Sequence, residues 1–177
     1  MDEDFKKWIA SLDAFHLPRW EELPKVSLYK EDVLNLVRKY VDDVVDSGEI
    51  PSITPSMVNN YVKWKMIPPP VNKQYDRVHI AYLIVITILK QVMPIADIKS
   101  GVQFQSMING TNKAYNYFCS EQENAIRYVC GRVGSGHVDH EIDVVIKNED
   151  IALKMATLAF ASKLVSLKKV KFQQDYL

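Results

Sequence analysis

The sequence has few of the residues that mark several common classes of protein. Its 177 residues include two cysteines, Cys119 and Cys130, which cannot build a disulfide framework or a four-cysteine zinc site. Its longest apolar run, residues 78–89, is broken by His79 and Thr87 and is shorter than the about 17–25 residues that span a bilayer. The chain opens Met-Asp-Glu-Asp, which has the wrong charge for a signal peptide. We therefore expect a cytoplasmic protein that does not enter a membrane.

The chain also lacks a net charge, because 22 basic residues balance 22 acidic ones. This excludes binding to nucleic acid through bulk positive charge. The charges are nevertheless unevenly distributed. Residues 1–49 carry 7 basic and 12 acidic side chains, residues 50–100 carry 6 and 2, and residues 101–177 carry 9 and 8. No acidic residue lies between Ile50 and Tyr75, so the middle of the chain is locally basic, as docking on a polyanion requires.

Glycine is scarce, at six residues, and apolar residues recur mostly at helical spacing. The pattern predicts an all-α protein in three parts: an N-terminal helical extension (1–30), a helix-turn-helix region (31–102) and a C-terminal helical region (103–177). Thr54-Pro55 and Asp76 are typical helix starts. The predicted helices are 5–14, 31–46, 54–65, 77–92, 94–102, 112–133 and a last one that starts at Asn148. Residues 16–28 are predicted as loop, and the alternation of Ile142, Val144 and Ile146 leaves a short strand open.

The predicted helix 54–65 has one continuous polar face. Ser56, Asn59, Asn60 and Lys63 follow one another at helical spacing, while Met57, Val58, Tyr61 and the stem of Trp64 fill much of the rest. A helix that enters the major groove needs such an apolar docking side and a polar, non-acidic reading side. Asparagine can pair bidentately with adenine, and lysine reaches guanine or a phosphate. An ordinary solvated helix face has the same pattern, so the stripe alone leaves both interpretations open.

The region resembles the MerR-type winged helix-turn-helix. The residues that carry the resemblance are Ile53-Thr54-Pro55-Ser56-Met57-Val58-Asn59-Asn60-Tyr61, Met66-Ile67-Pro68-Pro69-Pro70 and Tyr75-Asp76-Arg77-Val78-His79-Ile80. The whole chain is most similar to a group of uncharacterised bacterial proteins, the domain of unknown function 1836 family. The resemblance implies a small wing between Ile67 and Asp76, and a DNA-binding regulator.

Carried over residue by residue, the resemblance places Ser56 and Asn59 where the MerR family often has arginines that face DNA. Tyr61 falls on the second tyrosine of a pair, Lys63 on a basic position and Tyr75 on the wing tyrosine. The sequence departs from the family at Lys65, which replaces a glycine after the helix, and in its longer first helix and linker.

Three other features are weaker candidates for a site. His137–Asp143 groups metal-capable side chains, but a glycine-rich approach disfavours a formed metal site. Cys119 and Cys130 would lie about 16 Å apart on one helix, too far to share an ion. Gly131–Gly136 lacks the ending of a phosphate loop. We therefore predict no catalytic residues, no cofactor and no metal. The small residues of the last helix indicate either packing against helix 112–133 or a homodimer through the C-terminal helices.

The sequence thus predicts a DNA-binding transcriptional regulator whose partner is double-stranded DNA. Ser56, Asn59, Asn60 and Lys63 are expected to face the major groove, and Lys65, Lys73, Tyr75 and Arg77 to touch phosphates. The alternative is a protein-interaction module on the same scaffold, with Trp64 and Met66 as an apolar surface.

Overall fold

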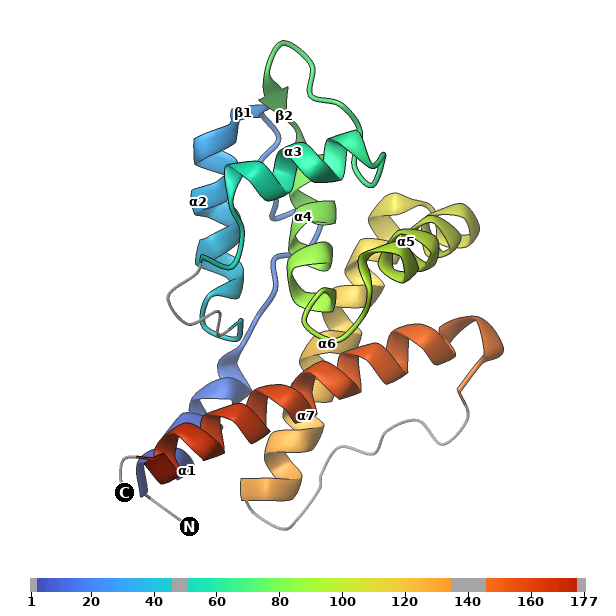
Figure 1. Ribbon diagram of the computed structural model, residues 1–177. Helices are drawn as coiled ribbons and strands as arrows, with labels where there is room; N and C mark the ends of the chain where they lie inside the picture. The colour runs from blue at the N-terminus through green and yellow to red at the C-terminus, as the bar shows by residue number, and fades with distance from the viewer. Residues whose placement is uncertain (1–2, 46–50, 135–145, 175–177) are drawn as a thin grey trace. The chain divides into compact units, whose positions relative to one another are not determined.

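The computed structural model describes residues 3–45, 51–134 and 146–174 (Figure 1). This part of the chain is mostly helical with one two-stranded sheet, which confirms the all-α prediction. In chain order the elements are α1 (Glu3–Ser11), the 3-10 turn η1 (Leu12–Ala14), β1 (Leu28–Tyr29), α2 (Lys30–Val41), α3 (Pro55–Lys63), β2 (Gln74–Tyr75), α4 (Arg77–Leu89), α5 (Ile95–Asn109), α6 (Thr111–Gly134), the 3-10 turn η2 (Asn148–Asp150) and α7 (Ile151–Gln174).

The chain divides into two compact units. The central unit is Leu17–Phe118, and the terminal unit combines Met1–His16 with Cys119–Leu177. Helix α6 begins in the first and ends in the second. Each unit has its own buried apolar residues and is described by itself.

In the central unit, α4 is the core helix. Ten of its thirteen residues are buried, which confirms that a helix apolar on nearly all sides lies inside. Helix α2 packs against α4 and buries Val33, Leu34, Val37 and Val41, and α3 packs against α2. Strands β1 and β2 are antiparallel, with Leu28 opposite Tyr75 and Tyr29 opposite Gln74. The sheet therefore ties the start of α2 to the segment that leads into α4.

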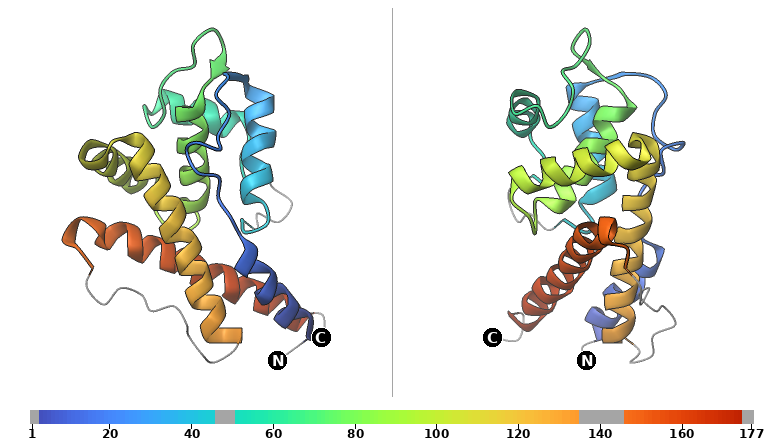
Figure 2. Two further views of the ribbon diagram at one scale, coloured as in Figure 1. Left: turned by 180° about the vertical axis from the view of Figure 1, so that it is seen from behind. Right: turned by 90° about the vertical axis from the view of Figure 1, so that its right-hand side faces the viewer.

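In the terminal unit, α1 lies beside the C-terminal part of α7 (Figure 2). Phe5 is 1% exposed and meets Phe172 edge-on, with ring centroids 5.8 Å apart. The Lys168 ammonium lies 5.6 Å from the Trp8 ring centroid. Lysines near the end of α7 thus cover aromatic rings of α1 as well as facing water.

Several element boundaries differ from the predicted ones. Helix α2 ends at Val41 instead of residue 46, because the amides of Val44 and Val45 both bond to the Val41 carbonyl in a turn. Helix α5 continues past Gly101, which a helix tolerates, to Gly110, whose positive φ of 76° ends it. Strand β1 falls at the end of the predicted loop 16–28 and just beyond it. The strand left open at Ile142–Ile146 lies mostly outside the described residues.

Candidate nucleic-acid interface

The start of α3 is held by side chains from two other helices. Thr54 Oγ1 accepts the Met57 amide at 3.2 Å, and Pro55 occupies the first helical position, as predicted. Arg38 of α2 donates from Nε and Nη2 to the Ile53 carbonyl, at 3.2 and 2.9 Å. Lys90, at the end of α4, donates to the Ser52 carbonyl at 2.5 Å, and burial lowers its pKa below the ordinary value. The orientation of α3 is therefore set by α2 and α4.

Helix α3 separates an apolar face from a polar one. Val58 and Tyr61 are buried in the central unit, and desolvation raises the pKa of Tyr61. Ser56, Asn59, Asn60 and Lys63 are all exposed, so the polar stripe predicted from the spacing lies on the surface. Its first turn contains no acidic residue. The exposed face of α3 can therefore approach a polyanion without repulsion from its own carboxylates.

The end of α3 is a Schellman turn in which lysine takes the place preferred by glycine. The Met66 amide bonds to the Tyr61 carbonyl at 2.9 Å, and the Lys65 amide to the Val62 carbonyl at 3.0 Å. Lys65 sits between them with a φ of +55°. Lys99 of α5 adds a bond to the Trp64 carbonyl at 2.9 Å. A lysine in this left-handed conformation costs about 1 kcal/mol, and the Lys65 side chain is exposed.

A two-residue hairpin turn follows the triple proline. Val71 and Gln74 exchange both backbone hydrogen bonds, at 3.1 and 2.9 Å, around Asn72 and Lys73. These central residues have φ values of +51° and +64°, as a type I′ turn requires. This hairpin, residues 68–75, forms the loop at the top of Figure 1 between α3 and α4. Asn72, Lys73 and Lys65 are the residues other than glycine that have a positive φ in the described part of the chain.

The hairpin is fastened to α4 by Asp76 and His79. The Asp76 carboxylate accepts the Val78 and His79 amides at 2.9 and 3.3 Å, and the Asp76 amide donates to His79 Nδ1 at 3.1 Å. The opposite ring nitrogen, Nε2, lies 3.1 Å from the Pro68 carbonyl oxygen. Because a carbonyl oxygen only accepts hydrogen bonds, Nε2 is the donor of this bond. The Tyr75 ring meets the imidazole edge-on at 5.2 Å. One buried histidine thus contacts both ends of the hairpin.

Replacement of Asp76 by alanine is expected to lower the free energy of unfolding by about 1 kcal/mol, because the helix cap is lost. Burial alone would raise the pKa of Asp76, but hydrogen bonds from His79 and Val78 bring it below 3.8. A carboxyl with a depressed folded pKa stabilises the fold above its unfolded pKa, and this contribution is lost as pH falls through the folded pKa. Thermal melts should therefore show a difference in melting temperature between the variant and wild type at neutral pH that shrinks below pH 3.8.

Asp76→Asn, which can cap the helix but cannot ionise, is the control. Equal melting temperatures of wild type and Asp76→Ala at neutral pH would contradict the prediction.

Two of the predicted phosphate contacts, Tyr75 and Arg77, have partners within the central unit. Tyr75 is 3% exposed, because its place opposite Leu28 in the sheet turns its ring inward onto His79. Arg77 bonds through Nη2 to the Leu23 carbonyl at 3.2 Å, and its guanidinium lies 5.6 Å from the Trp20 ring centroid. The burial of Tyr75 corrects its assignment as a phosphate contact. Arg77 is partly exposed, and its assignment as a phosphate contact stays a prediction. Lys65 and Lys73 are exposed, as that assignment needs.

An open groove of about 540 Å³ runs beside α3. It is lined by residues from the start of α2, from α3 and from the hairpin: Tyr29, Lys30, Glu31, Asn59, Val62, Pro70, Lys73 and Tyr75. Lys30 donates to Asn59 Oδ1 at 2.7 Å. Sequence reasoning missed Tyr29 and Lys30, because Lys30 precedes Asn59 by 29 positions and belongs to the acidic first segment. The structure brings this lysine to the predicted polar stripe.

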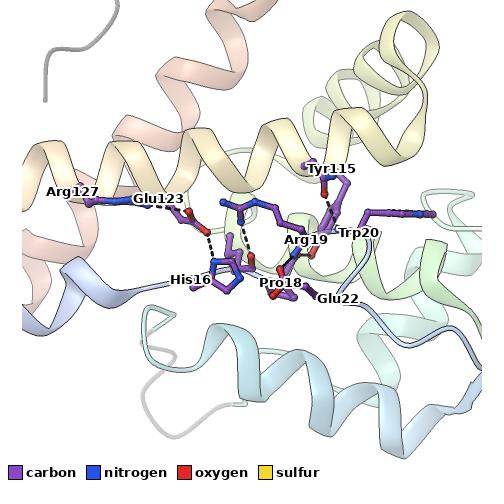
Figure 3. Close-up of polar contacts among 10 residues, drawn as sticks. His16, Pro18, Arg19, Trp20, Glu22, Tyr115, Glu123 and Arg127 are labelled. Atoms are coloured by element: carbon purple, nitrogen blue, oxygen red, sulfur yellow. Dashed lines mark hydrogen bonds and ion pairs between the residues drawn. The ribbon is translucent and has the colours of Figure 1, made fainter.

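Two side-chain networks outside α3 are drawn in Figure 3. In the central unit, the Tyr115 hydroxyl donates to the Pro18 carbonyl at 2.8 Å, and Asn116 Oδ1 accepts the Trp20 amide at 2.7 Å. These bonds attach the first loop of the unit to α6.

In the terminal unit, the Glu123 carboxylate is 4% exposed. It lies 3.3 Å from His16 Nδ1 and 3.0 Å from Arg127 Nη2. The buried Glu123 carboxylate is therefore shared between two basic side chains of the terminal unit.

The weaker candidates gain no support. The segment His137–Asp143 and residues 135–136 lie outside the described residues, whereas Gly131–Gly134 form the end of α6. The described residues contain no group of three metal-capable side chains. Cys119 and Cys130 are buried, and burial together with the charge of Asp13 raises the pKa of the Cys130 thiol to about 11. No helix in the described ranges is long and apolar enough to cross a membrane.

Comparison with known proteins identifies the family. A family model described as "Domain of unknown function (DUF1836)" matches residues 18–118, more than half of the chain. The chain belongs to the DUF1836 family. The match coincides within one residue with the central unit, Leu17–Phe118, so the DUF1836 domain and this compact unit are the same part of the chain. No curated protein and no solved structure matches the chain.

Proposed function

We propose that the central unit is a MerR-like winged helix-turn-helix that binds double-stranded DNA, and that the protein is a transcriptional regulator. In this proposal α2 and α3 are the helix-turn-helix, and the hairpin 68–75 with β1 is the wing. Helix α3 enters the major groove with Ser56, Asn59, Asn60 and Lys63 toward the bases. Lys65 and Lys73 flank it and contact phosphates.

The observation that carries the proposal is the backbone conformation of these two lysines. Glycine adopts positive φ without steric cost, and asparagine adopts it more readily than most residues. Lysine has neither advantage, yet Lys65 and Lys73 both hold this conformation and both are exposed. Backbone strain is often retained at functional residues, and here it would be offset by the contact of each lysine with a DNA phosphate. Both charges flank the polar face of α3, whose first turn contains no carboxylate.

Glycine substitution at these positions gives a sharp test. Lys65→Gly and Lys73→Gly should each raise the free energy of unfolding by about 0.5–1 kcal/mol, because the left-handed strain is relieved. Each should nevertheless weaken binding to a labelled random-sequence duplex. If the lysine contacts one phosphate, the slope of log affinity against log salt should fall by about 0.9. Fluorescence anisotropy across a salt series and thermal melts measure the two effects.

The matched control is Lys39→Met, which removes an exposed lysine from the same unit near the end of α2. It should leave the salt slope unchanged. The proposal is contradicted if the wild-type protein does not bind the duplex at low salt. It is also contradicted if the glycine variants keep the wild-type slope of log affinity against log salt.

A protein-interaction module is the second candidate function. The observation in its favour is that two large apolar side chains, Trp64 after α3 and Val71 in the hairpin, are 47% and 72% exposed. Met66, which the sequence grouped with Trp64, is 8% exposed and belongs to the core instead. This candidate is favoured if the folded wild-type protein does not bind DNA at low salt and if Trp64→Ala abolishes binding to a protein partner.

A further inference from the structure

The bond between Lys30 and Asn59 fixes how α3 presents its central asparagine. An asparagine amide has an oxygen that accepts and a nitrogen that donates, whereas a lysine ammonium only donates. Because Lys30 Nζ lies 2.7 Å from the amide, the oxygen must be the atom that faces it. The Asn59 nitrogen is thereby turned away from Lys30, with its two N–H groups available to a ligand.

The pair then presents an excess of hydrogen-bond donors. Asn59 offers two N–H groups, and the Lys30 ammonium retains two further donors and its positive charge. In the major groove, guanine presents two acceptors, N7 and O6, and no donor. Adenine presents the acceptor N7 but also the N6 amino donor, which would meet the Lys30 charge. The local electrostatics therefore favour guanine.

The other charged group at the start of α2 fits the same base pair. Glu31 lines the groove together with Lys30 and Asn59, and its carboxylate accepts hydrogen bonds only. Cytosine presents the N4 amino donor in the major groove, to which acidic side chains bind. One groove thus holds donors suited to guanine and an acceptor suited to its partner.

We propose that Lys30 and Asn59 act as one donor pair that makes the protein select guanine over adenine at one position of its DNA site. This inference rests on the proposed function and deepens it. Lys30 is a positioning and specificity-determining residue outside α3. It also revises the simplest expectation for an asparagine on a reading helix, which is adenine.

Selection from a randomised duplex pool, followed by sequencing, tests the inference. Wild type should enrich sites in which one position is guanine, and Asn59→Ala should lose the preference at that position. Lys30→Met should lower the guanine-to-adenine ratio there by about fivefold or more, the lower end for a good contact pair. Lys30→Arg, which still donates to Asn59, should keep it. Lys39→Met on the same helix is the matched control, and thermal melts establish that each variant is folded.

The outcomes separate the two proposals. If wild type enriches no sequence, the proposed DNA-reading function fails and this inference with it. If wild type enriches a site but no position depends on Asn59, or Lys30→Met keeps the guanine preference, or the dependent base is adenine, this inference alone is overturned.

Discussion

Glu123→Ala is expected to lower the stability of the terminal unit by about 3 kcal/mol, because it removes one partner of a buried ion pair. The carboxylate is 4% exposed and lies within 3.3 Å of His16 and 3.0 Å of Arg127 (Figure 3). Truncation leaves the Arg127 guanidinium, itself only 27% exposed, without this partner, and also leaves a void on the buried side of α6. The loss of the ion pair and the void both lower the free energy of unfolding.

Hydrogen exchange measured by mass spectrometry localises the loss. Protection should fall in α1, α7 and the last part of α6, while α2 and α4 keep theirs. Glu123→Gln retains the size and the acceptor oxygen and should cost less than alanine. Asn124→Ala, at an exposed position on the same helix, should change stability by less than about 0.5 kcal/mol. A Glu123→Ala protein as stable as Asn124→Ala would show that the buried carboxylate is not a structural anchor.

Arg38→Met is expected to destabilise the central unit by about 2 kcal/mol and to weaken the proposed DNA binding without changing its salt dependence. Arg38 donates two bonds to the carbonyl of Ile53, a residue that is 0% exposed. Methionine preserves much of the aliphatic stem but leaves that carbonyl without its charged donor, which costs about 1.5–3 kcal/mol. Because Ile53 immediately precedes the Thr54 cap, the loss also loosens the start of α3.

The salt series distinguishes positioning from contact. Arg38 is engaged with the backbone, so its removal should lower affinity at every salt concentration while the slope of log affinity against log salt stays at the wild-type value. Lys39→Met, at the next position of α2, is the matched control for both stability and binding. A slope reduced by about 0.9 would instead make Arg38 a phosphate contact, and unchanged melting would remove its structural role.

Local signals explain which parts of this fold could be predicted. Thr54-Pro55 and Asp76 placed the starts of α3 and α4 correctly, because a cap depends on residues a few positions apart. The exposure of Ser56, Asn59, Asn60 and Lys63 followed from helical spacing alone. By contrast, Val44 and Val45 fit the helical spacing of α2 but are buried in a turn, so the pattern overextended that helix.

The missed features depend on backbone conformation or on distant partners. Asn72-Lys73 does not carry the Asn-Gly signal of a type I′ turn, so the hairpin geometry was not readable from the residues. The inward direction of Tyr75 follows from its pairing with Leu28, a residue 47 positions earlier. The bond of Lys30 to Asn59 spans 29 positions. Counting charges along the chain groups Lys30 with the acidic residues 1–49, whereas the fold places it beside Asn59 of α3.

The burial of the two cysteines makes the native thiols slow to react. A pKa of about 11 leaves Cys130 with about one hundredth of the thiolate that a thiol of pKa 9.0 has at neutral pH, and Cys119 is 0% exposed. An alkylating reagent should therefore modify a newly introduced surface cysteine long before either native one. Lys73→Cys would place such a handle at the hairpin tip without removal of Cys119 or Cys130. A photo-crosslinker attached there would mark whatever molecule the protein meets in the cell, whether duplex or polypeptide.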